Sequence, residues 1–171
     1  MRTDRNIVLI GFMGCGKSLT SKKLRKVLNR KVVSTDDLIE KREKRSIKKI
    51  FAAEGENYFR KVEKEVVREI SKLKGVVVDC GGGVYLDSDN ATYLKRNGTV
   101  FYLSATPKCI YDNIKIRKNR PLLNVRDPLA TIKELLEARK PYYEKADVVI
   151  DADYKTIDQI AESIVKVIEN E

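Results

Sequence analysis

The chain has 171 residues, 42% of them hydrophobic and 35% charged, a composition that excludes a disordered chain and fits one domain spanning residues 1–171. No apolar run approaches the roughly 18 residues that a membrane span needs, so a membrane is not an expected partner. The formal net charge is +10, but acidic residues alternate with basic ones in Glu40–Arg45, as on a solvated helix face. We therefore expect the basic charge to serve small anionic ligands rather than nucleic acid.

Apolar runs typical of buried strands alternate with helical patterns along the chain, which predicts an α/β fold with a parallel sheet. Strands are predicted at Asn6–Ile10, Lys31–Ser34, Gly75–Asp79, Thr99–Leu103 and Asp147–Asp151. Helices are predicted at Lys17–Asn29, Asp36–Arg45, Ile47–Glu54, Glu56–Lys72, Ser88–Arg96, Pro107–Arg117, Pro128–Glu144 and Ile157–Glu169. Residues 118–126 are polar and lie between two of these helices, so we expect either a mobile lid or an ordinary surface connection there.

The first predicted strand leads directly into Gly11–Ser18, which matches the pattern G-x-x-x-x-G-K-[ST] in full and precedes a helix. In that context the pattern predicts a loop whose backbone N–H groups face phosphates at a helix N-terminus. A tight turn would explain the glycines but not the next pair, because Lys17 suits the β- and γ-phosphates and the Ser18 hydroxyl suits direct coordination of Mg²⁺. The expected ATP-binding residues of this segment are Gly14, Cys15, Gly16, Lys17, Ser18 and Leu19.

Two features follow predicted strands, whose carboxyl ends face the ligand in an open α/β sheet. Asp36 comes after the second strand, and its carboxylate could accept the proton of a substrate hydroxyl. The competing interpretation of Asp36 is an N-cap of the next helix. Gly81, Gly82 and Gly83 come after the third strand. Because three consecutive glycines are a costly way to turn a chain, they suggest backbone that approaches a ligand closely.

Two arginines complete the predicted acceptor side. Arg60 lies off the apolar stripe that Phe59, Val66 and Ile70 form in its helix, and Arg139 lies in the segment that follows the lid. Taken alone, an arginine is most often a surface residue. Since the guanidinium fork matches a carboxylate, the two arginines together would form an anion clamp.

Composition also limits the chemistry and the compartment. The chain has no histidine, which excludes a histidine-based triad or metal site. Its three cysteines, Cys15, Cys80 and Cys109, lack C-x-x-C spacing, so we expect reduced thiols in a cytoplasmic protein rather than a disulfide or zinc framework. The first residues lead directly into the first predicted strand, so we expect no signal peptide.

Taken in order, these motifs resemble the shikimate kinase family from Ile7 to about Asp151. The matching segments are G-F-M-G-x-G-K-S at Gly11–Ser18, D-x-D at Ser34–Asp36, F-R-x-x-E at Phe59–Glu63, the triple glycine, R-P-L-L at Arg120–Leu123 and R-x-P-x-Y at Arg139–Tyr143. The resemblance implies a nucleoside-monophosphate-kinase-like P-loop fold, with a five-stranded parallel sheet in the order 2-3-1-4-5, flanking helices and a lid loop. It also implies Mg²⁺-dependent transfer of the ATP γ-phosphoryl group to the 3-hydroxyl of shikimate, in chorismate and aromatic amino-acid biosynthesis, by a monomer.

On the acceptor side, the resemblance assigns the roles residue by residue. Asp36 would contact the shikimate hydroxyls and act as the base, in a substrate-binding segment of about residues 36–61. Arg60 and Arg139 would bind the shikimate carboxylate. Gly82 would approach the ring, with Gly81 and Gly83 as further substrate-binding residues.

On the donor side, the resemblance adds two arginines to the phosphate-binding loop. Arg120, on a lid at about residues 118–126, would reach the phosphates together with Lys17 as the transition state forms. Arg117 is a candidate to stack on adenine. The expected catalytic residues are therefore Lys17, Asp36 and Arg120.

One position departs from the family pattern. Ser34 stands where the family usually has the first aspartate of D-x-D, which helps to hold Mg²⁺ through water. Asp79 directly follows Val76–Val78, where relatives commonly have a small neutral residue. Other P-loop enzymes bind Mg²⁺ with an aspartate at such a strand end together with the P-loop serine or threonine. We therefore expect Ser18 as the direct ligand and Asp79 and Ser34 as contacts through water, the alternative being that Asp79 caps the glycine turn.

Two other functions are compatible with these residues. A gluconate kinase of the same fold would also act on an acceptor with hydroxyls and a carboxylate, although the triple glycine and the R-x-P-x-Y motif favour shikimate. A nucleotide-binding regulator that has lost catalysis is the second alternative. Such a module need not keep Lys17, Asp36, Arg120 and Arg139, so their presence argues against it.

Overall fold

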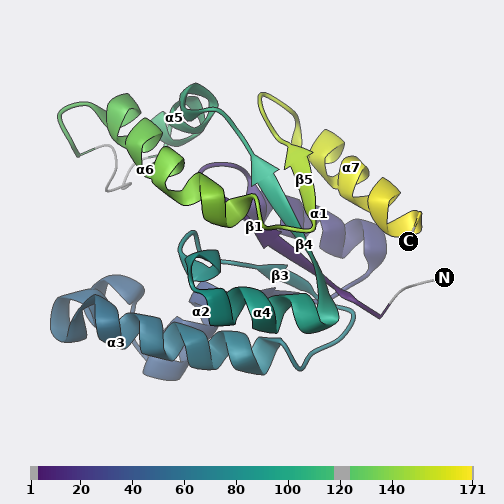
Figure 1. The fold of residues 1–171 in the computed structure, drawn as a ribbon, viewed down its shortest axis with the longest axis horizontal. Coiled ribbons are helices and arrows are strands. Elements are labelled where there is room, and N and C mark those ends of the chain that lie inside the picture. The colour runs from purple at the N-terminus through teal and green to yellow at the C-terminus, as the bar shows by residue number, and fades with distance from the viewer. Residues whose placement is uncertain (1–3, 118–123, 171) are drawn as a thin grey trace.

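The computed structural model describes residues 4–117 and 124–170. Within them, five strands form one sheet in the order β2-β3-β1-β4-β5, and every neighbouring pair is parallel (Figure 1). The fold class and strand order predicted from the sequence are therefore confirmed. The strands are β1 Asn6–Ile10, β2 Val32–Ser34, β3 Val77–Asp79, β4 Gly98–Ser104 and β5 Val148–Asp151.

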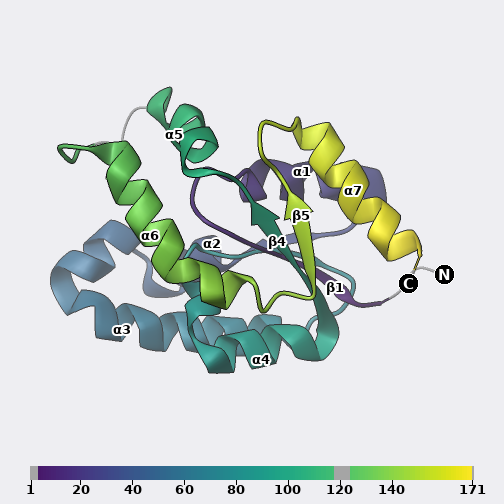
Figure 2. The same cartoon turned by 45° about the horizontal axis from the view of Figure 1, so that its top comes forward.

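Helices cover both faces of this sheet. Those of the described residues are α1 Lys17–Leu28, α2 Thr35–Glu43, α3 Ile47–Ile70, α4 Ser88–Asn97, α5 Pro107–Lys115, α6 Pro128–Tyr143 and α7 Ile157–Glu169, with a 3₁₀ turn, η1, at Val84–Leu86. α1 and α7 lie side by side on one face, and α4 lies on the other with α3 packed along it (Figures 1 and 2). α6 packs against both α5 and η1, which brings it close to the turn that follows β3.

The core is built around β1, which is buried along its whole length between β3 and β4. Because helices cover both faces, the inner strands are continuous apolar runs rather than alternating ones. Val77, Val78 and Phe101, for example, have no exposed surface. This packing holds the carboxyl ends of β1, β2 and β3 at one edge of the sheet.

The start of α2 differs from the prediction. The helix begins at Thr35, one residue earlier than expected, because the Ser34 hydroxyl is its N-cap and accepts a 3.2 Å hydrogen bond from the Asp37 amide. Asp36 therefore lies inside the first turn, and the interpretation of Asp36 as the N-cap is wrong. Its carboxylate is not used to cap the helix.

The sequence pattern predicts separate helices on either side of Gly55, and the backbone of α3 confirms this break. Gly55 has φ 81° and ψ 179° within α3, a non-helical conformation that is essentially restricted to glycine. α3 therefore consists of two helical segments that meet at a kink at Gly55. Several helix ends differ from the prediction by one or two residues, as in α5, which ends at Lys115 rather than at Arg117.

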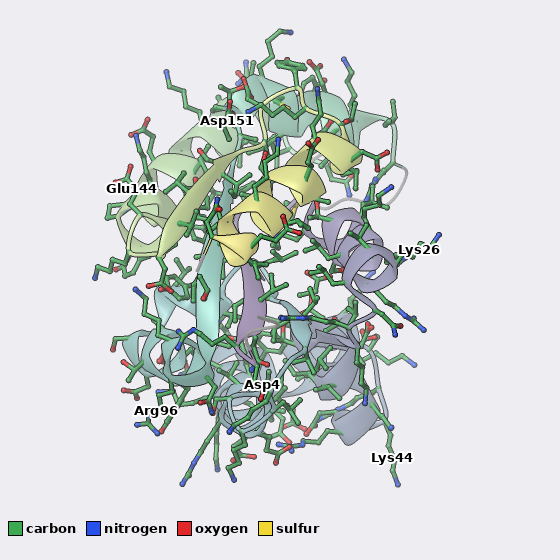
Figure 3. All side chains as sticks on the ribbon, turned by 90° about the vertical axis from the view of Figure 1, so that its right-hand side faces the viewer. Asp4, Lys26, Lys44, Arg96, Glu144 and Asp151 are labelled. Atoms are coloured by element: carbon green, nitrogen blue, oxygen red, sulfur yellow. The ribbon has the colours of Figure 1, made fainter. Side chains whose placement is uncertain are left out.

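Charged side chains are spread over the surface rather than massed on one face. In Figure 3, Lys26 of α1, Lys44 after α2 and Arg96 of α4 point into solvent at separate places. Some basic groups are paired with acids, as Lys64 is with Asp87 at 3.0 Å. In the two described ranges, no helix combines the length and the apolar character that crossing a membrane requires.

Candidate active site

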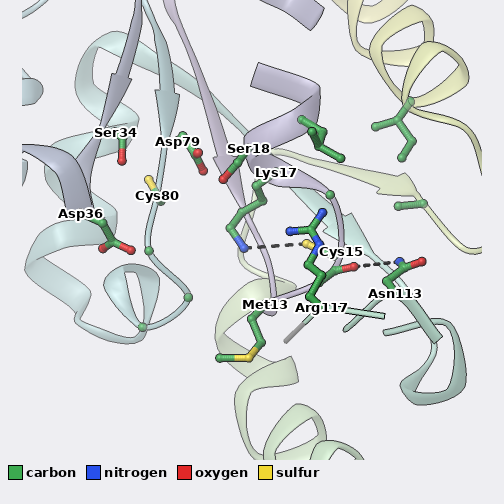
Figure 4. Close-up of a pocket in the computed structure, with 18 of the residues that line it drawn as sticks. Met13, Cys15, Lys17, Ser18, Ser34, Asp36, Asp79, Cys80, Asn113 and Arg117 are labelled. Atoms are coloured by element: carbon green, nitrogen blue, oxygen red, sulfur yellow. Dashed lines mark hydrogen bonds between the residues drawn. The ribbon is translucent and has the colours of Figure 1, made fainter. Parts of the chain in front are cut away.

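A cavity of about 790 Å³ opens at the carboxyl edge of the sheet, where ligands bind in open α/β folds (Figure 4). Every predicted site residue within the described ranges lines it, from both the ATP side and the acceptor side. Arg120 lies outside the described residues, as do residues 118–123 of the predicted lid. The fold thus brings together predicted site residues that are up to 125 positions apart, such as Gly14 and Arg139.

The loop from Gly11 to Ser18 joins β1 to α1, as the pattern predicts. Gly16 caps the helix with φ 100°, a left-handed value that glycine adopts without strain. The first N–H groups of a helix have no partner within it, and the first turn of α1 contains no acidic residue. Ser18 and Leu19 are exposed at this end. The helix N-terminus is therefore open to an anion.

The Lys17 side chain folds back on this loop. Its Nζ donates hydrogen bonds to the carbonyl oxygens of Gly11 at 2.7 Å and Phe12 at 3.1 Å, and it lies 3.8 Å from Cys15 Sγ. Figure 4 shows the Cys15 thiol joined to the Lys17 ammonium by a dashed line, and only 3% of the Cys15 residue is exposed. The ammonium charge is thus held at the centre of the predicted phosphate site.

Asp36 lies against the first of the three glycines. A Cβ atom on Gly81 would be 2.6 Å from Asp36 Oδ1, so only glycine allows this approach. The Thr35 hydroxyl accepts a 2.8 Å hydrogen bond from the Gly81 amide, which joins the ends of β2 and β3. Burial raises the pKa of the Asp36 carboxyl, the charge of Asp79 raises it further, and Lys17 opposes both. A carboxylate with a raised pKa is a stronger proton acceptor.

Arg60 lies against the last of the three glycines. A Cβ atom on Gly83 would be 2.7 Å from both Nη1 and Nη2 of Arg60. Nη1 donates a 2.7 Å hydrogen bond to Glu63 Oε1 one turn further along α3, and the Glu63 side chain is 2% exposed. Burial raises the pKa of Glu63, although its bond with Arg60 opposes the shift. Glu63 therefore fixes the direction of the guanidinium.

Arg139 lies against the middle glycine and above the P-loop. A Cβ atom on Gly82 would be 3.5 Å from Arg139 Nη1, and the guanidinium carbon lies 5.2 Å from the centre of the Phe12 ring. Tyr143, one turn along α6, donates a 2.6 Å hydrogen bond to the Gly82 carbonyl oxygen and stacks on Tyr102. Among the described residues, no carboxylate lies within ion-pair distance of Arg139. Its charge is therefore available to an anion.

Asp79 lies at the end of β3, beside the P-loop. Burial raises the pKa of its carboxyl, while a hydrogen bond with Ser18 and the charge of Lys17 oppose the shift. Ser34 is the register partner of Asp79 on β2, and Figure 4 shows Asp79 between Ser34 and Ser18. The Gly81 amide, in contrast, is bound by Thr35, so it is not Asp79 that caps the first residue of the glycine turn.

The donor atoms at this place suit Mg²⁺. Hydroxyl and carboxylate oxygens are hard ligands, and Mg²⁺ is usually bound by one or two protein oxygens together with phosphates and water. In the described part of the chain, no group of three or more acidic, cysteine or histidine side chains could hold a metal by itself. Ser18 and Asp79 therefore fit a metal that arrives with a nucleotide better than one held by protein alone.

Several residues that line the cavity were not singled out by the sequence patterns, among them Asn113 and Tyr154. Asn113 of α5 donates a 2.8 Å hydrogen bond from Nδ2 to the Gly14 carbonyl oxygen, and Tyr154, after β5, lines the same cavity as the exposed Arg117. Neither belongs to a recognisable motif. For Tyr154, its position after the carboxyl end of a predicted strand was the signal that could have found it.

The family model described as "Shikimate kinase" matches residues 13–169 of the chain. The chain belongs to the shikimate kinase family. The shikimate kinase of Caldanaerobacter subterraneus subsp. tengcongensis is 46% identical to it over 162 residues, covering 95% of each chain. That of Thermodesulfovibrio yellowstonii is 44% identical over 162 residues, covering 95% of this chain and 94% of the relative.

Solved structures agree with this assignment. The shikimate kinase from Acinetobacter baumannii in complex with shikimate is 33% identical, with a TM-score of 0.91, and the match covers 99% of this chain and 95% of that one. The enzyme from Aquifex aeolicus is 32% identical, with a TM-score of 0.82 and 96% of each chain covered. A deoxyadenosine kinase from M. mycoides with bound dATP, at 16% identity and a TM-score of 0.62, shares the fold alone.

Proposed function

We propose that the protein transfers the γ-phosphoryl group of ATP to the 3-hydroxyl of shikimate, giving shikimate 3-phosphate for chorismate and aromatic amino-acid biosynthesis. The observation that carries this proposal is the contact of Asp36, Arg139 and Arg60 with three successive glycines beside a phosphate-binding loop. One carboxylate and two guanidinium groups around a narrow turn suit an acceptor that has both hydroxyls and a carboxylate. The complex of the related A. baumannii enzyme with shikimate supports the same acceptor here.

The donor half would be the P-loop. Its N–H groups and Lys17 would surround the β- and γ-phosphates, and the Ser18 hydroxyl would be the direct protein ligand of Mg²⁺. When bound, the metal neutralises charge on the phosphate oxygens. Because phosphoryl transfer depends on alignment and charge neutralisation more than on covalent chemistry, the main task of Lys17 is to hold its charge where the transferred group passes.

The acceptor half would be the side of the cavity opposite the P-loop. Asp36 would accept a hydrogen bond from the reacting hydroxyl and take its proton as the oxygen attacks phosphorus. Arg60, beside the last of the three glycines, and Arg139, beside the middle one, would bind the shikimate carboxylate, and the backbone of the triple glycine would approach the ring. Because the charge of Arg60 is shared with Glu63, Arg139 would supply the larger part of the attraction.

Two further roles rest on the family resemblance. Arg120, on a lid at about residues 118–126, would neutralise phosphate charge as the transition state forms, and closure of the lid would keep out water that hydrolyses ATP. Arg117, an exposed residue that lines the cavity, would stack on adenine. Both proposals concern the ATP side and leave the acceptor assignment unchanged.

We propose that the protein works in the cytoplasm as a monomeric single domain. Cys15, Cys80 and Cys109 are all free thiols, which fits a reducing compartment. The proposed partners are the small molecules ATP and shikimate, without nucleic acid or a membrane.

A coupled assay of ADP formation with ATP, Mg²⁺ and either shikimate or gluconate tests the function. We expect rapid ADP formation with shikimate and none above background with gluconate. Lys17→Met should abolish the reaction and keep the far-ultraviolet circular dichroism of the native protein. Faster turnover with gluconate would identify a gluconate kinase, and nucleotide binding without turnover of either acceptor would identify a regulator; both results contradict the proposal.

A further inference from the structure

The end of β3 carries a carboxylate whose position is defined by two neighbouring strands. β2 and β3 are parallel and in register, and Ser34 is the partner of Asp79 in that register. On the other side, β3 pairs with β1, and Asp79 is the partner of Leu9, which precedes the P-loop. Because register partners in a sheet direct their side chains to the same face, Ser34 and Asp79 are two adjacent positions from which a side chain can reach Ser18.

Of these two register partners, only Asp79 directs its side chain to Ser18, because the Ser34 hydroxyl caps α2. The Asp79 carboxylate is hydrogen-bonded with Ser18, and Figure 4 shows it directed toward that residue, at the exposed N-terminus of α1. The Ser34 hydroxyl is engaged elsewhere, since it accepts the Asp37 amide hydrogen bond that caps α2. A neutral hydroxyl that already accepts a hydrogen bond is a weak acceptor for a water molecule bound to a cation. A carboxylate oxygen, which is charged, accepts a much stronger hydrogen bond from such a water.

Asp79 also lacks a cationic partner of its own. No Lys or Arg of the described residues lies within ion-pair distance of it, and the Lys17 ammonium, whose charge acts on Asp79, donates its hydrogen bonds to the carbonyl oxygens of Gly11 and Phe12. Asp36 and Asp37 add further negative charge nearby. A half-buried carboxylate among other carboxylates is unfavourable unless a cation compensates for it. This arrangement therefore favours binding of a cation beside Ser18.

We propose that Asp79 orients the water shell of the Mg²⁺ that enters with the nucleotide, acting from β3 while Ser18 is the direct ligand. The carboxylate that assists the metal thus lies one strand away from Ser34, across the β2–β3 ladder. This inference rests on the proposed kinase function and makes it more specific. It predicts that a carboxylate can be moved between the two register positions without loss of metal binding.

The test measures metal binding separately from turnover. Isothermal titration calorimetry gives the affinity for ADP with and without Mg²⁺, and electron paramagnetic resonance counts Mn²⁺ bound to the ADP complex. Asp79→Asn should weaken metal binding in the ADP complex roughly 10-fold or more, as loss of a residue that orients a metal's ligands does. It should leave metal-free ADP affinity unchanged. Ser34→Asp combined with Asp79→Asn should restore most of the metal affinity.

A matched control is Asp37→Asn, which removes a charge from the same cavity but not from the register pair of β2 and β3, and it should lower the metal affinity far less than Asp79→Asn does. Asp79→Ser serves as a second variant if Asp79→Asn does not fold. Unchanged metal affinity in the Asp79 variants would overturn the inference, as would an equal loss of metal-free ADP affinity or no recovery in the double variant. The two proposals can fail separately. The wild-type assay with shikimate tests which acceptor is phosphorylated, whereas the titrations of the Asp79 variants test which residue assists metal binding.

Discussion

The Tyr143 hydroxyl donates a 2.6 Å hydrogen bond to the Gly82 carbonyl oxygen, and this bond joins the end of α6 to the glycine turn that follows β3. Tyr143 has no exposed surface, and its ring stacks on Tyr102 of β4 at 5.0 Å. Arg139, one helical turn earlier, is thereby held over the same glycine. The position of one clamp arginine is thus set by a phenol that does not itself need to touch the acceptor.

Tyr143→Phe tests this link. The variant keeps the ring and leaves the Gly82 carbonyl without its donor, so we expect the free energy of unfolding to fall by about 1 kcal/mol. The KM for shikimate should rise several-fold while ADP affinity is unchanged. Tyr142→Phe is the control, because Tyr142 is the exposed neighbour on the same helix. If both variants behave alike, the hydrogen bond does not position the clamp.

Arg60→Ala and Arg139→Ala should each damage the use of shikimate far more than nucleotide binding. A lost charge-assisted hydrogen bond is worth about 1.5–3 kcal/mol, or roughly 10- to 100-fold in affinity. Separate titrations of ADP and shikimate measure the two effects, with Arg96→Ala on α4 as an exposed control. An equal loss of both ligands would place these arginines outside the acceptor site.

The same two variants should differ in stability. Arg60→Ala leaves Glu63 buried without its partner, whereas Arg139 has no ion pair among the described residues. Removing one member of a buried pair is destabilising because the other charge stays uncompensated. Thermal unfolding should therefore show a larger fall in Tm for Arg60→Ala, and Arg60→Ala/Glu63→Gln should recover part of it.

The pH dependence should follow Asp36. Burial and then Asp79 raise the pKa of its carboxyl, and a base works only when ionised, so kcat/KM for shikimate should fall at a higher pH than for an ordinary aspartate. Asp79→Asn should move this acidic limb to lower pH, and Asp37→Asn should move it less.

The stability of the ligand-free protein should also depend on Asp36. A carboxyl whose pKa is raised by folding makes the protein lose stability as the pH rises through that pKa. Asp79→Asn should remove part of this loss.

A pH profile recorded at saturating Mg²⁺, together with Tm values measured without ligands, tests both statements. An acidic limb that does not move in Asp79→Asn would show that Asp36 is not the titrating group.

Cys15 provides a probe of the loop. Its thiol lies 3.8 Å from Lys17 Nζ, so a bulky adduct there should displace Lys17. We expect a thiol-modifying reagent to inactivate the enzyme, bound ATP to slow the inactivation, and Cys15→Ala to remove the sensitivity. Cys80 should contribute little, because burial raises its pKa well above the ordinary value. Mass spectrometry shows which thiol carries the adduct. If the protein modified on Cys15 keeps normal activity, the expectation that the adduct displaces Lys17 is wrong.

The sequence predicted the parts of the site that have local patterns. The P-loop was recognisable because its glycines and Lys17 are consecutive, and the triple glycine because such a run has few structural uses. The cap of α2 was misassigned, since Ser34, Thr35 and Asp36 are all good N-cap residues and only the end of β2 decides among them. Asn113 and Tyr154 were missed because only the order of the strands brings their segments to the P-loop.

The most direct test of the account is the identity of the phosphorylated product. Shikimate is incubated with the wild-type protein, ATP and Mg²⁺, and the product is analysed by mass spectrometry and by phosphorus–proton coupling in NMR spectra. The account predicts a monophosphate whose phosphorus couples to the proton on carbon 3, formed in equal amount with ADP, and no product with Lys17→Met. Phosphate on another hydroxyl, or release of inorganic phosphate without a shikimate ester, would contradict it.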